Sequence, residues 1–316
     1  MKTFGAVAPA VAVELASHRV SAAAIEIRGG RPVVAMHATE ALPPGALVPA
    51  LVGENMPGRA AVTSALGRVL EQMGRPRRIG LILPDPVAKI SLVRFAQMPA
   101  RTQDLDQLVR WQVRKAAPFP IDEGQVSYVP GVHAPDGHEF IVSVARRAVI
   151  EEYEAVCEGV GAHAGLVDIS TFNVINAVLA GSRPPNADWL LVNVATDYTS
   201  IAIMRSADLI LFRSRGPDGE GSLADLVHQT SMYYEDRLEG AGFSRVVLGG
   251  AFANLDQAAN AEHVRRSLEE RLGTAVEAVD VRETAALTDR IGASAALVDT
   301  LMPLVGLLLR ERGAAA

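Results

Sequence analysis

The sequence predicts an α/β protein of two lobes, each built on its own sheet. The chain has 316 residues, of which 49% are apolar, and this length suits about two domains of roughly 150 residues each. Strand-like and helix-like segments alternate along it, which is typical of α/β proteins. A group of three short apolar strands near the N-terminus recurs in the second half, and a repeat of this size indicates two equivalent lobes.

Each group is predicted to form a meander of three strands. The first copy consists of segments rich in β-branched and small apolar residues, at 10–15, 20–27 and 32–37, with Gly29 and Gly30 as a favoured hairpin turn. The second copy covers residues 189–194, 199–205 and 209–212. Aligning Ala16 with Ala195 pairs three further positions of the two copies, Glu14 with Asn193, Ser17 with Thr196 and Ser21 with Ser200.

Further elements are expected between the two meanders. Strands are predicted at residues 78–83 and 89–95, and a helix over 102–117 that Pro118 ends. A hairpin of residues 125–132 and 139–145 then turns around residues 134–137.

A helix follows over residues 147–161, where apolar residues recur at helical spacing. Cys157 lies in that apolar set, so we expect it to be buried in the core rather than to act as a nucleophile.

The second half begins after residues 181–187, a Pro-containing stretch that follows a predicted helix over 171–179 and is a candidate hinge. The expected elements beyond the second meander are a helix over 223–238, a strand over 245–248 and a helix over 263–272. The last apolar tract, residues 293–309, is interrupted by Asp299 and Pro303 and is shorter than the roughly 20 residues of a membrane helix. It is expected to be a buried helix.

Composition excludes several classes of function. A net charge of −6 and a pI near 5.7 provide no basic surface for nucleic acid. Cys157 is the only cysteine, so neither a disulfide nor a cysteine-based zinc site can form within the chain. His133 and His138 flank a predicted turn without further ligands at metal spacing, so no metal site is expected. With no signal peptide evident, the predicted location is the cytoplasm.

Four segments spread over nearly the whole chain carry a family resemblance. The most specific is RWQVRKAAPFPIDEGQVSYV at residues 110–129, a helix that ends in a PFP turn and an acidic pair before a strand. The others are IVSVARRAVIEEYEAVCEGVGAHAGLVDISTFNVINA at 141–177, RVVLGGAFANLD at 245–256 and MPLVGLLLR at 302–310. In this order they resemble the PilM family of type IV pilus assembly proteins, which is similar to the cell-division protein FtsA.

The resemblance implies an actin-like ATPase (ribonuclease H-like) fold. The first actin-like lobe would cover residues 1–183 and include an FtsA-like inserted subdomain over about 84–165. The second lobe would cover residues 184–316.

The resemblance also implies a role in pilus biogenesis and twitching motility. The chain would be a cytoplasmic adaptor, peripheral at the inner membrane, that binds the N-terminal cytoplasmic tail of a PilN-like bitopic membrane protein in a groove beside the inserted subdomain. Other pilus platform and motor proteins stay open as partners, while nucleic acid and direct membrane insertion are not expected. Two alternatives remain: a cytoplasmic component of a type II secretion platform, and an active ATPase or sugar-kinase-like enzyme on the same scaffold.

In actin-like proteins the nucleotide phosphates lie between two hairpin turns, and a glycine pair leaves room for adenosine. The matching positions are Glu14, Ala16, Ser17, His18, Arg19 and Ser21 in the first turn, Asn193, Ala195, Thr196, Asp197 and Thr199 in the second, and Gly249, Gly250 and Ala251 on the adenosine side. Ala16 adds a Cβ where the backbone must approach phosphate, and Asn193 supplies no charge for magnesium. We therefore expect a pseudo-ATPase with no catalytic residue, and binding of ATP with magnesium stays open.

Overall fold

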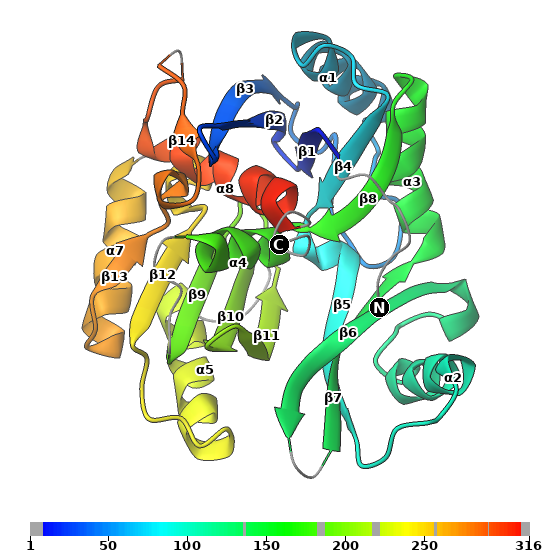
Figure 1. The fold of residues 1–316 in the computed structure, drawn as a ribbon, viewed down its shortest axis with the longest axis vertical. Helices are drawn as coiled ribbons and strands as arrows, with labels where there is room; N and C mark the ends of the chain where they lie inside the picture. Colours follow the sequence, from blue (N-terminus) through cyan, green and yellow to red (C-terminus); the bar gives the residue numbers. More distant parts are fainter. Residues whose placement is uncertain are drawn as a thin grey trace.

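The computed structural model describes residues 9–134, 137–181, 187–216, 222–255, 258–289 and 291–310. Three sheets organise them (Figure 1). The first has the strand order β14-β3-β2-β1-β4-β8, the second β11-β10-β9-β12-β13, and the third β5-β7-β6.

Both predicted meanders are confirmed. In the first sheet they are the antiparallel strands β1 (Val11–Ala16), β2 (Arg19–Arg28) and β3 (Arg31–Ala41). Gly29 and Gly30 have φ angles of 56° and 77°, the left-handed conformation that a tight hairpin turn requires. In the second sheet the strands are β9 (Asp188–Val194), β10 (Thr199–Arg205) and β11 (Asp208–Arg215).

The duplication extends beyond the meanders. In the first sheet, β4 (Arg78–Leu83) pairs in parallel with β1, and β8 (His163–Ile169) pairs in parallel with β4. In the second sheet, β12 (Arg245–Gly249) pairs in parallel with β9, and β13 (Val276–Ala278) with β12. Apart from β14, which only the first sheet has, the two sheets therefore share one strand order and one set of directions.

Helices form layers on both sides of the two sheets. The outer face of the first sheet is covered by α1 (Arg59–Gln72) and α3 (Arg147–Gly159), whose apolar side includes the buried Cys157 as predicted. The outer face of the second sheet is covered by α5 (Leu223–Arg237) and α7 (Ala258–Leu272). Between the sheets lie α4 (Ser170–Ala180) and α8 (Ala295–Arg310), which share one apolar cluster with both of them.

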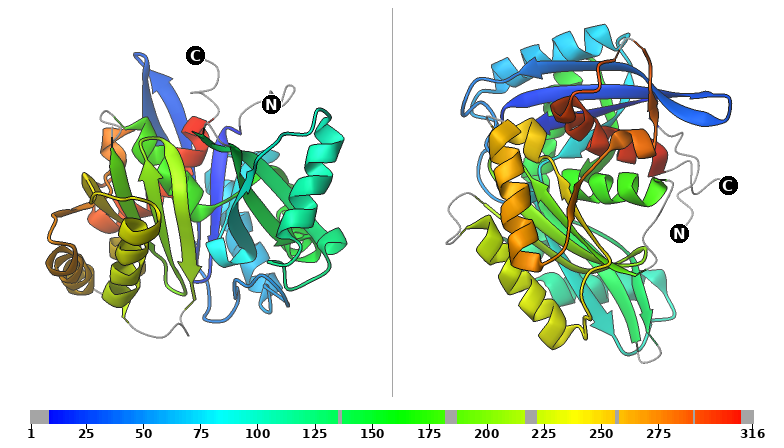
Figure 2. Two further views of the ribbon diagram at one scale, coloured as in Figure 1. Left: turned by 90° about the horizontal axis from the view of Figure 1, so that it is seen from below. Right: turned by 90° about the vertical axis from the view of Figure 1, so that its left-hand side faces the viewer.

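The third sheet is inserted between β4 and α3. It consists of β5 (Ala88–Phe95), β6 (Gly124–Ala134) and β7 (Gly137–Arg146), with α2 (Thr102–Val113) packed on one face around a separate apolar core. In the left view of Figure 2 this unit lies on the side away from α5 and α7. Single-turn helices are present at η1 (Asp85–Val87), η2 (Ile121–Glu123) and η3 (Val281–Glu283).

The helix predicted over 102–117 ends four residues early, at Val113. The amide of Ala116 bonds the carbonyl of Val113 in a tight turn. Pro118 disfavours helical geometry at the residue before it, so the pattern of apolar residues overestimates the length.

The C-terminal segment contributes to both lobes. The strand β14 (Ala286–Leu287) joins the first sheet beside β3, and α8 packs against β1, β2, α4 and the short helix α6 (Ala251–Asn254). The expectation that residues 293–309 form a buried helix is confirmed, because α8 is buried from Val298 to Leu308. Within the described residues, none of the helices combines the length and the apolar character needed to span a membrane.

The domain boundaries proposed at residues 183 and 184 stay a prediction. The candidate hinge falls largely on residues 182–186, outside the described residues, as do residues 135 and 136 of the predicted hairpin turn.

Candidate functional site: a closed interlobe cleft and an open groove

The turns of the two meanders face each other between the lobes. The first joins β1 to β2 and the second joins β9 to β10, and both line a cavity of about 30 Å³. Its walls include most of the residues predicted from the sequence, namely Glu14, Ala16, Ser17, His18, Arg19, Asn193, Ala195, Thr196, Asp197 and Gly250.

Four of the predicted residues do not line this cavity. Ser21 is buried in β2 and its hydroxyl accepts a hydrogen bond from Thr39 at 3.2 Å. Thr199 begins β10, Gly249 ends β12, and Ala251 begins α6 with its side chain buried. These four residues lie close in the sequence to residues that line the cavity, but they do not line it themselves.

Glu14 lies at the base of the first turn. Its Oε1 accepts a hydrogen bond from the Ser170 hydroxyl at 2.8 Å, and its Oε2 lies 3.8 Å from Nη2 of Arg19. Burial raises the pKa of the Glu14 carboxyl, and the charge of Arg19 and the Ser170 hydrogen bond oppose that shift. The carboxylate is thus already engaged by the protein's own groups.

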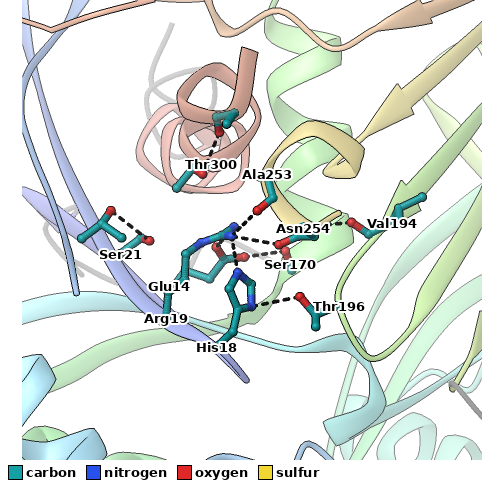
Figure 3. Close-up of polar contacts among 12 residues, drawn as sticks. Glu14, His18, Arg19, Ser21, Ser170, Val194, Thr196, Ala253, Asn254 and Thr300 are labelled. Carbon is teal, nitrogen blue, oxygen red and sulfur yellow. Dashed lines mark hydrogen bonds and ion pairs between the residues drawn. The ribbon is translucent and has the colours of Figure 1, made fainter. Parts of the chain in front are cut away.

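Arg19 is the longest side chain in the cleft. Its Nη1 donates to the carbonyl of Ala253 at 3.1 Å and to Oδ1 of Asn254 at 2.8 Å, both on α6 of the opposite lobe (Figure 3). Arg19 therefore brings a positive charge into the cleft and reaches across it to the opposite lobe. The cation contacts a carbonyl and an amide instead of a phosphate.

The two turns also touch directly. The ring nitrogens of His18 lie 3.0 Å from the Thr196 hydroxyl and 2.6 Å from Nη1 of Arg19. Burial and the charge of Arg19 lower the pKa of His18 to about 4, so the imidazole is neutral at pH 7. A neutral ring that accepts from Arg19 through Nε2 carries its proton on Nδ1 and donates it to Thr196.

A second polar cluster lies behind the turns, around a carboxylate that sequence reasoning missed. Asp85 is fully buried and accepts hydrogen bonds from the amide and hydroxyl of Thr171 and from the hydroxyl of Ser200, at 3.0 Å from the amide and 2.5 Å from Ser200. Nδ2 of Asn193 donates to the Thr171 hydroxyl at 2.7 Å. Burial raises the pKa of Asp85 to about 6. Groups from both lobes therefore converge on one carboxylate.

The glycine pair shapes the other side of the cleft. Gly250 has a φ of 76°, and a Cβ there would lie 2.3 Å from the carbonyl oxygen of Val194. The backbone needs glycine at this point because α6 starts directly against β9. Asp299 of α8, also missed from the sequence, accepts a hydrogen bond from the amide of Phe252 at 2.7 Å, and burial raises its pKa to about 6.

A second and much larger cavity lies on the other side of α4. It has a volume of about 790 Å³ and runs between the third sheet, α3, β8 and α4, with a wall from β10 and β11. Alternate residues of β6 and β7 face it, including Val129 and Ile141, and α4 contributes Phe172, Ile175 and Leu179. We call this cavity the subdomain groove.

The edge of the first sheet borders the subdomain groove. In the strand order β8 is the last strand and pairs with β4, and residues 164–169 of β8 line the groove. Two carboxylates of α3, Glu151 and Glu154, lie at its wall, and at another point Asp168 is ion-paired with Arg310. The groove is thus largely apolar with a partly charged rim.

A model of the protein family described as type IV pilus assembly protein PilM matches residues 12–245. The chain belongs to this family. The PilM family assignment agrees with the resemblance found in the four sequence segments.

The fold of the PilM-family chain is similar to that of several solved structures. The structure titled "PilM-PilN type IV pilus biogenesis complex" matches with a TM-score of 0.78 at 17% identity, covering 96% of this chain and 98% of that one. A Bacteroides thetaiotaomicron protein with actin-like ATPase fold has a TM-score of 0.49 at 10% identity, covering 85% and 90% of the two chains. The cytoplasmic domain of EpsL from Vibrio cholerae has a TM-score of 0.48 at 10% identity, covering 97% and 94%.

ATP and magnesium are the ligands that an actin-like ATPase fold implies in the interlobe cleft. Small-molecule pockets have volumes of about 300 to 1,000 Å³, whereas this cleft encloses about 30 Å³. Asn193 presents an amide, already bonded to Thr171, where magnesium would need a carboxylate. The residues of the closed cleft therefore do not fit magnesium-ATP.

Within the part of the chain whose side chains are described, no three His, Cys, Asp or Glu residues gather as a metal site. The side chain of His133 lies outside that part. The expectations of no metal, no hydrolysis and uncertain ATP binding stay predictions.

Proposed function

We propose that this PilM-family chain is a non-catalytic adaptor of the type IV pilus assembly platform at the inner membrane. Its cytoplasmic location and its contact with the membrane through a PilN-like protein belong to the same proposal. Two observations support it: the family match over residues 12–245, and a groove of about 790 Å³ beside the inserted subdomain. The groove is the observation that carries the proposed binding.

The dimensions and lining of the subdomain groove suit a short peptide. Its volume lies in the range of ligand-binding pockets, and its floor is apolar. An extended tail could add to the outer edge of β8 through main-chain hydrogen bonds, while its apolar side chains enter the floor formed by Ile141, Phe172 and Ile175. The matched structure of a PilM-PilN complex supports a PilN-like protein as the source of that tail.

An equilibrium titration tests this proposal. A fluorescent peptide with the sequence of the N-terminal cytoplasmic tail of the PilN-like protein from the same organism is titrated with the full chain. We expect saturable binding in the micromolar range or tighter. A tail from the corresponding type II secretion partner serves as the competing peptide, and preferential binding of that tail would support the type II secretion alternative instead.

Val129→Asp is a suitable groove variant. Val129 lines the groove and is 51% exposed, so the substitution places a charge on the apolar wall with little effect on the core. We expect the dissociation constant to rise about tenfold or more, as for loss of a well-placed apolar contact.

Ile27→Asp is the matched control. Ile27 is a β-branched strand residue, 53% exposed, and lies outside the groove. The Ile27→Asp protein should bind the tail with the same affinity as the wild type. Equal weakening by both substitutions, or by neither, would contradict binding of the tail in the subdomain groove.

A further inference from the structure

Arg19 connects the two lobes through a small number of well-defined contacts. It is the first residue of β2, directly after the first turn, and its side chain is 11% exposed. Its hydrogen-bond acceptors, Ala253 and Asn254, belong to α6 more than 230 residues later in the chain, with a separation of 235 for Asn254. A buried guanidinium requires such acceptors, because an unpaired charge away from water is costly.

The helix that receives Arg19 is itself held firmly on the second lobe. Nδ2 of Asn254 donates to the carbonyl of Val194 at 2.8 Å, and Phe252 donates to Asp299 at 2.7 Å. Arg19 donates near the C-terminal end of α6, where carbonyl groups carry partial negative charge. The contact of Arg19 with α6 therefore connects β2 to a helix that is itself hydrogen-bonded to β9 of the second sheet.

Contacts between the two turns reinforce the same closure. His18 bonds Thr196 at 3.0 Å, and a hydrogen bond from Ser17 opposes the increase in the pKa of Asp197 that burial causes. Thus Ser17 and His18 of the first turn and Arg19 at the start of β2 each contact the second lobe.

We propose that Arg19 acts as an internal ligand of the interlobe cleft and, with the His18–Thr196 contact, holds the two lobes closed without any nucleotide. The guanidinium occupies the space between the turns and contributes the cross-lobe hydrogen bonds. The cleft that would open and close around a bound ligand is here closed by a side chain of the same chain. This inference concerns the lobes themselves and holds whether or not the subdomain groove binds a pilus protein.

The distance between the lobes measures this closure directly. Spin labels are attached to cysteines introduced at Gln72 on α1 and Arg266 on α7, both exposed. Cys157 does not interfere, because it is buried and burial raises the pKa of its thiol to about 12. Pulsed electron–electron double resonance on the full chain should give one narrow distribution of distances between the two labels without nucleotide. Addition of magnesium-ATP should leave that distribution unchanged.

Arg19→Met should shift that distribution to longer distances and broaden it, since methionine keeps an apolar stem but cannot donate. Amide exchange at Ala195 and Phe252 should become at least about tenfold faster, as expected for loss of charge-assisted hydrogen bonds. Arg28→Met is the control, because Arg28 lies on the same strand and pairs only with Glu26 among the contacts described for it. Its distribution should match that of the wild type.

Thr196→Val provides a second variant that leaves the buried charges intact. It removes the hydroxyl that His18 contacts on an exposed turn, so the fold should tolerate it. We expect a smaller shift in the same direction, and this variant decides the matter if Arg19→Met does not fold. An unchanged distribution in the variants that fold, or a broad wild-type distribution that magnesium-ATP narrows, would overturn the proposal.

Discussion

The interlobe cleft and the subdomain groove lie on opposite sides of one helix and differ in volume and in how their polar groups are paired. Ser170 and Val174 of α4 line the cleft, while Phe172 and Ile175 line the groove. The cleft encloses about 30 Å³ and is crossed by hydrogen bonds between the two lobes, whereas the groove is largely apolar and about 790 Å³ in volume. In the cleft the chain satisfies its own polar groups, whereas the groove exposes apolar surface that a partner could cover.

This comparison separates an inherited site from the site proposed to act. The fold places two turns and a glycine pair where an actin-like ATPase would hold a nucleotide. Here those elements contact one another, and a much larger cavity lies beside the inserted subdomain. Substitutions in the cleft should therefore change stability and lobe closure, and substitutions in the groove should change binding.

The largest difference between cleft and groove substitutions is expected in the free energy of unfolding when a polar side chain is removed. Asp85→Ala leaves the amide and hydroxyl of Thr171 and the hydroxyl of Ser200 without their common acceptor. We expect it to lower the free energy of unfolding by about 3 kcal/mol. Urea denaturation followed by circular dichroism measures the change.

Ser143→Ala is the groove counterpart of that variant. Ser143 lines the groove and is partly exposed, so its loss should change the free energy of unfolding by less than about 0.5 kcal/mol. Similar losses of unfolding free energy for Asp85→Ala and Ser143→Ala would contradict the distinction between a cleft whose polar groups are hydrogen-bonded within the chain and an open groove.

The stability costs of replacing a glycine by alanine in the cleft and in the groove should differ by a smaller amount. Gly250→Ala forces a Cβ against the backbone oxygen of Val194 at a φ of 76°, and we expect a loss of about 2 kcal/mol in the free energy of unfolding. At Gly165 in the groove, a Cβ would meet the side chain of the exposed Arg78. That side chain can move away, so Gly165→Ala should cost less than about 0.5 kcal/mol, as thermal unfolding of the two variants would show.

The smallest expected effect is the pH dependence of the His18 contact. The folded pKa of His18 is lowered to about 4 from an ordinary 6.5, so folding favours the neutral imidazole. Its contribution to stability is present above pH 6.5 and declines as the pH falls from 6.5 toward 4. The charged groups that line the same cavity are Arg19 and Glu14 from its own hairpin, Asp197 from the opposite turn and Asp299 from α8.

Comparison with His18→Gln isolates this dependence. The carboxyls of Asp85 and Asp299 have raised pKa values and respond in the opposite direction, but they are present in both proteins and cancel. The stability advantage of the wild type over the variant should shrink between pH 7.5 and pH 5.5 in urea titrations. An advantage that grows on acidification would mean that His18 is protonated in the folded protein.

Local sequence patterns predicted most of the fold. Both meanders, the inserted hairpin and the buried C-terminal helix were predicted because turn residues and apolar periodicity act over a few positions. The helix α1 and the strand β8 were not predicted. In β8 all five residues from Ala164 to Asp168 are half-buried, so the alternation that reveals a strand facing water on one side is absent.

For the candidate site, internal duplication was the useful signal. It identified the two facing turns, because a repeat of the sequence produced a repeat of the sheet. Asp85 and Asp299 were missed because each stands alone in the sequence. A lone acid in an apolar tract, as Asp299 is in residues 293–309, could have suggested a buried acceptor, but not which amide it bonds.

The sequence by itself determined the two equivalent sheets and the family to which the chain belongs, and the inserted subdomain was expected only from that family's fold. Turn residues, apolar periodicity and family motifs all depend on residues that are close together in the sequence. Only the tertiary structure decided that Arg19 reaches Asn254 across the cleft and that the groove opens on the far side of α4. Contacts between residues more than 200 positions apart depend on how the lobes close, and that depends on packing throughout the molecule.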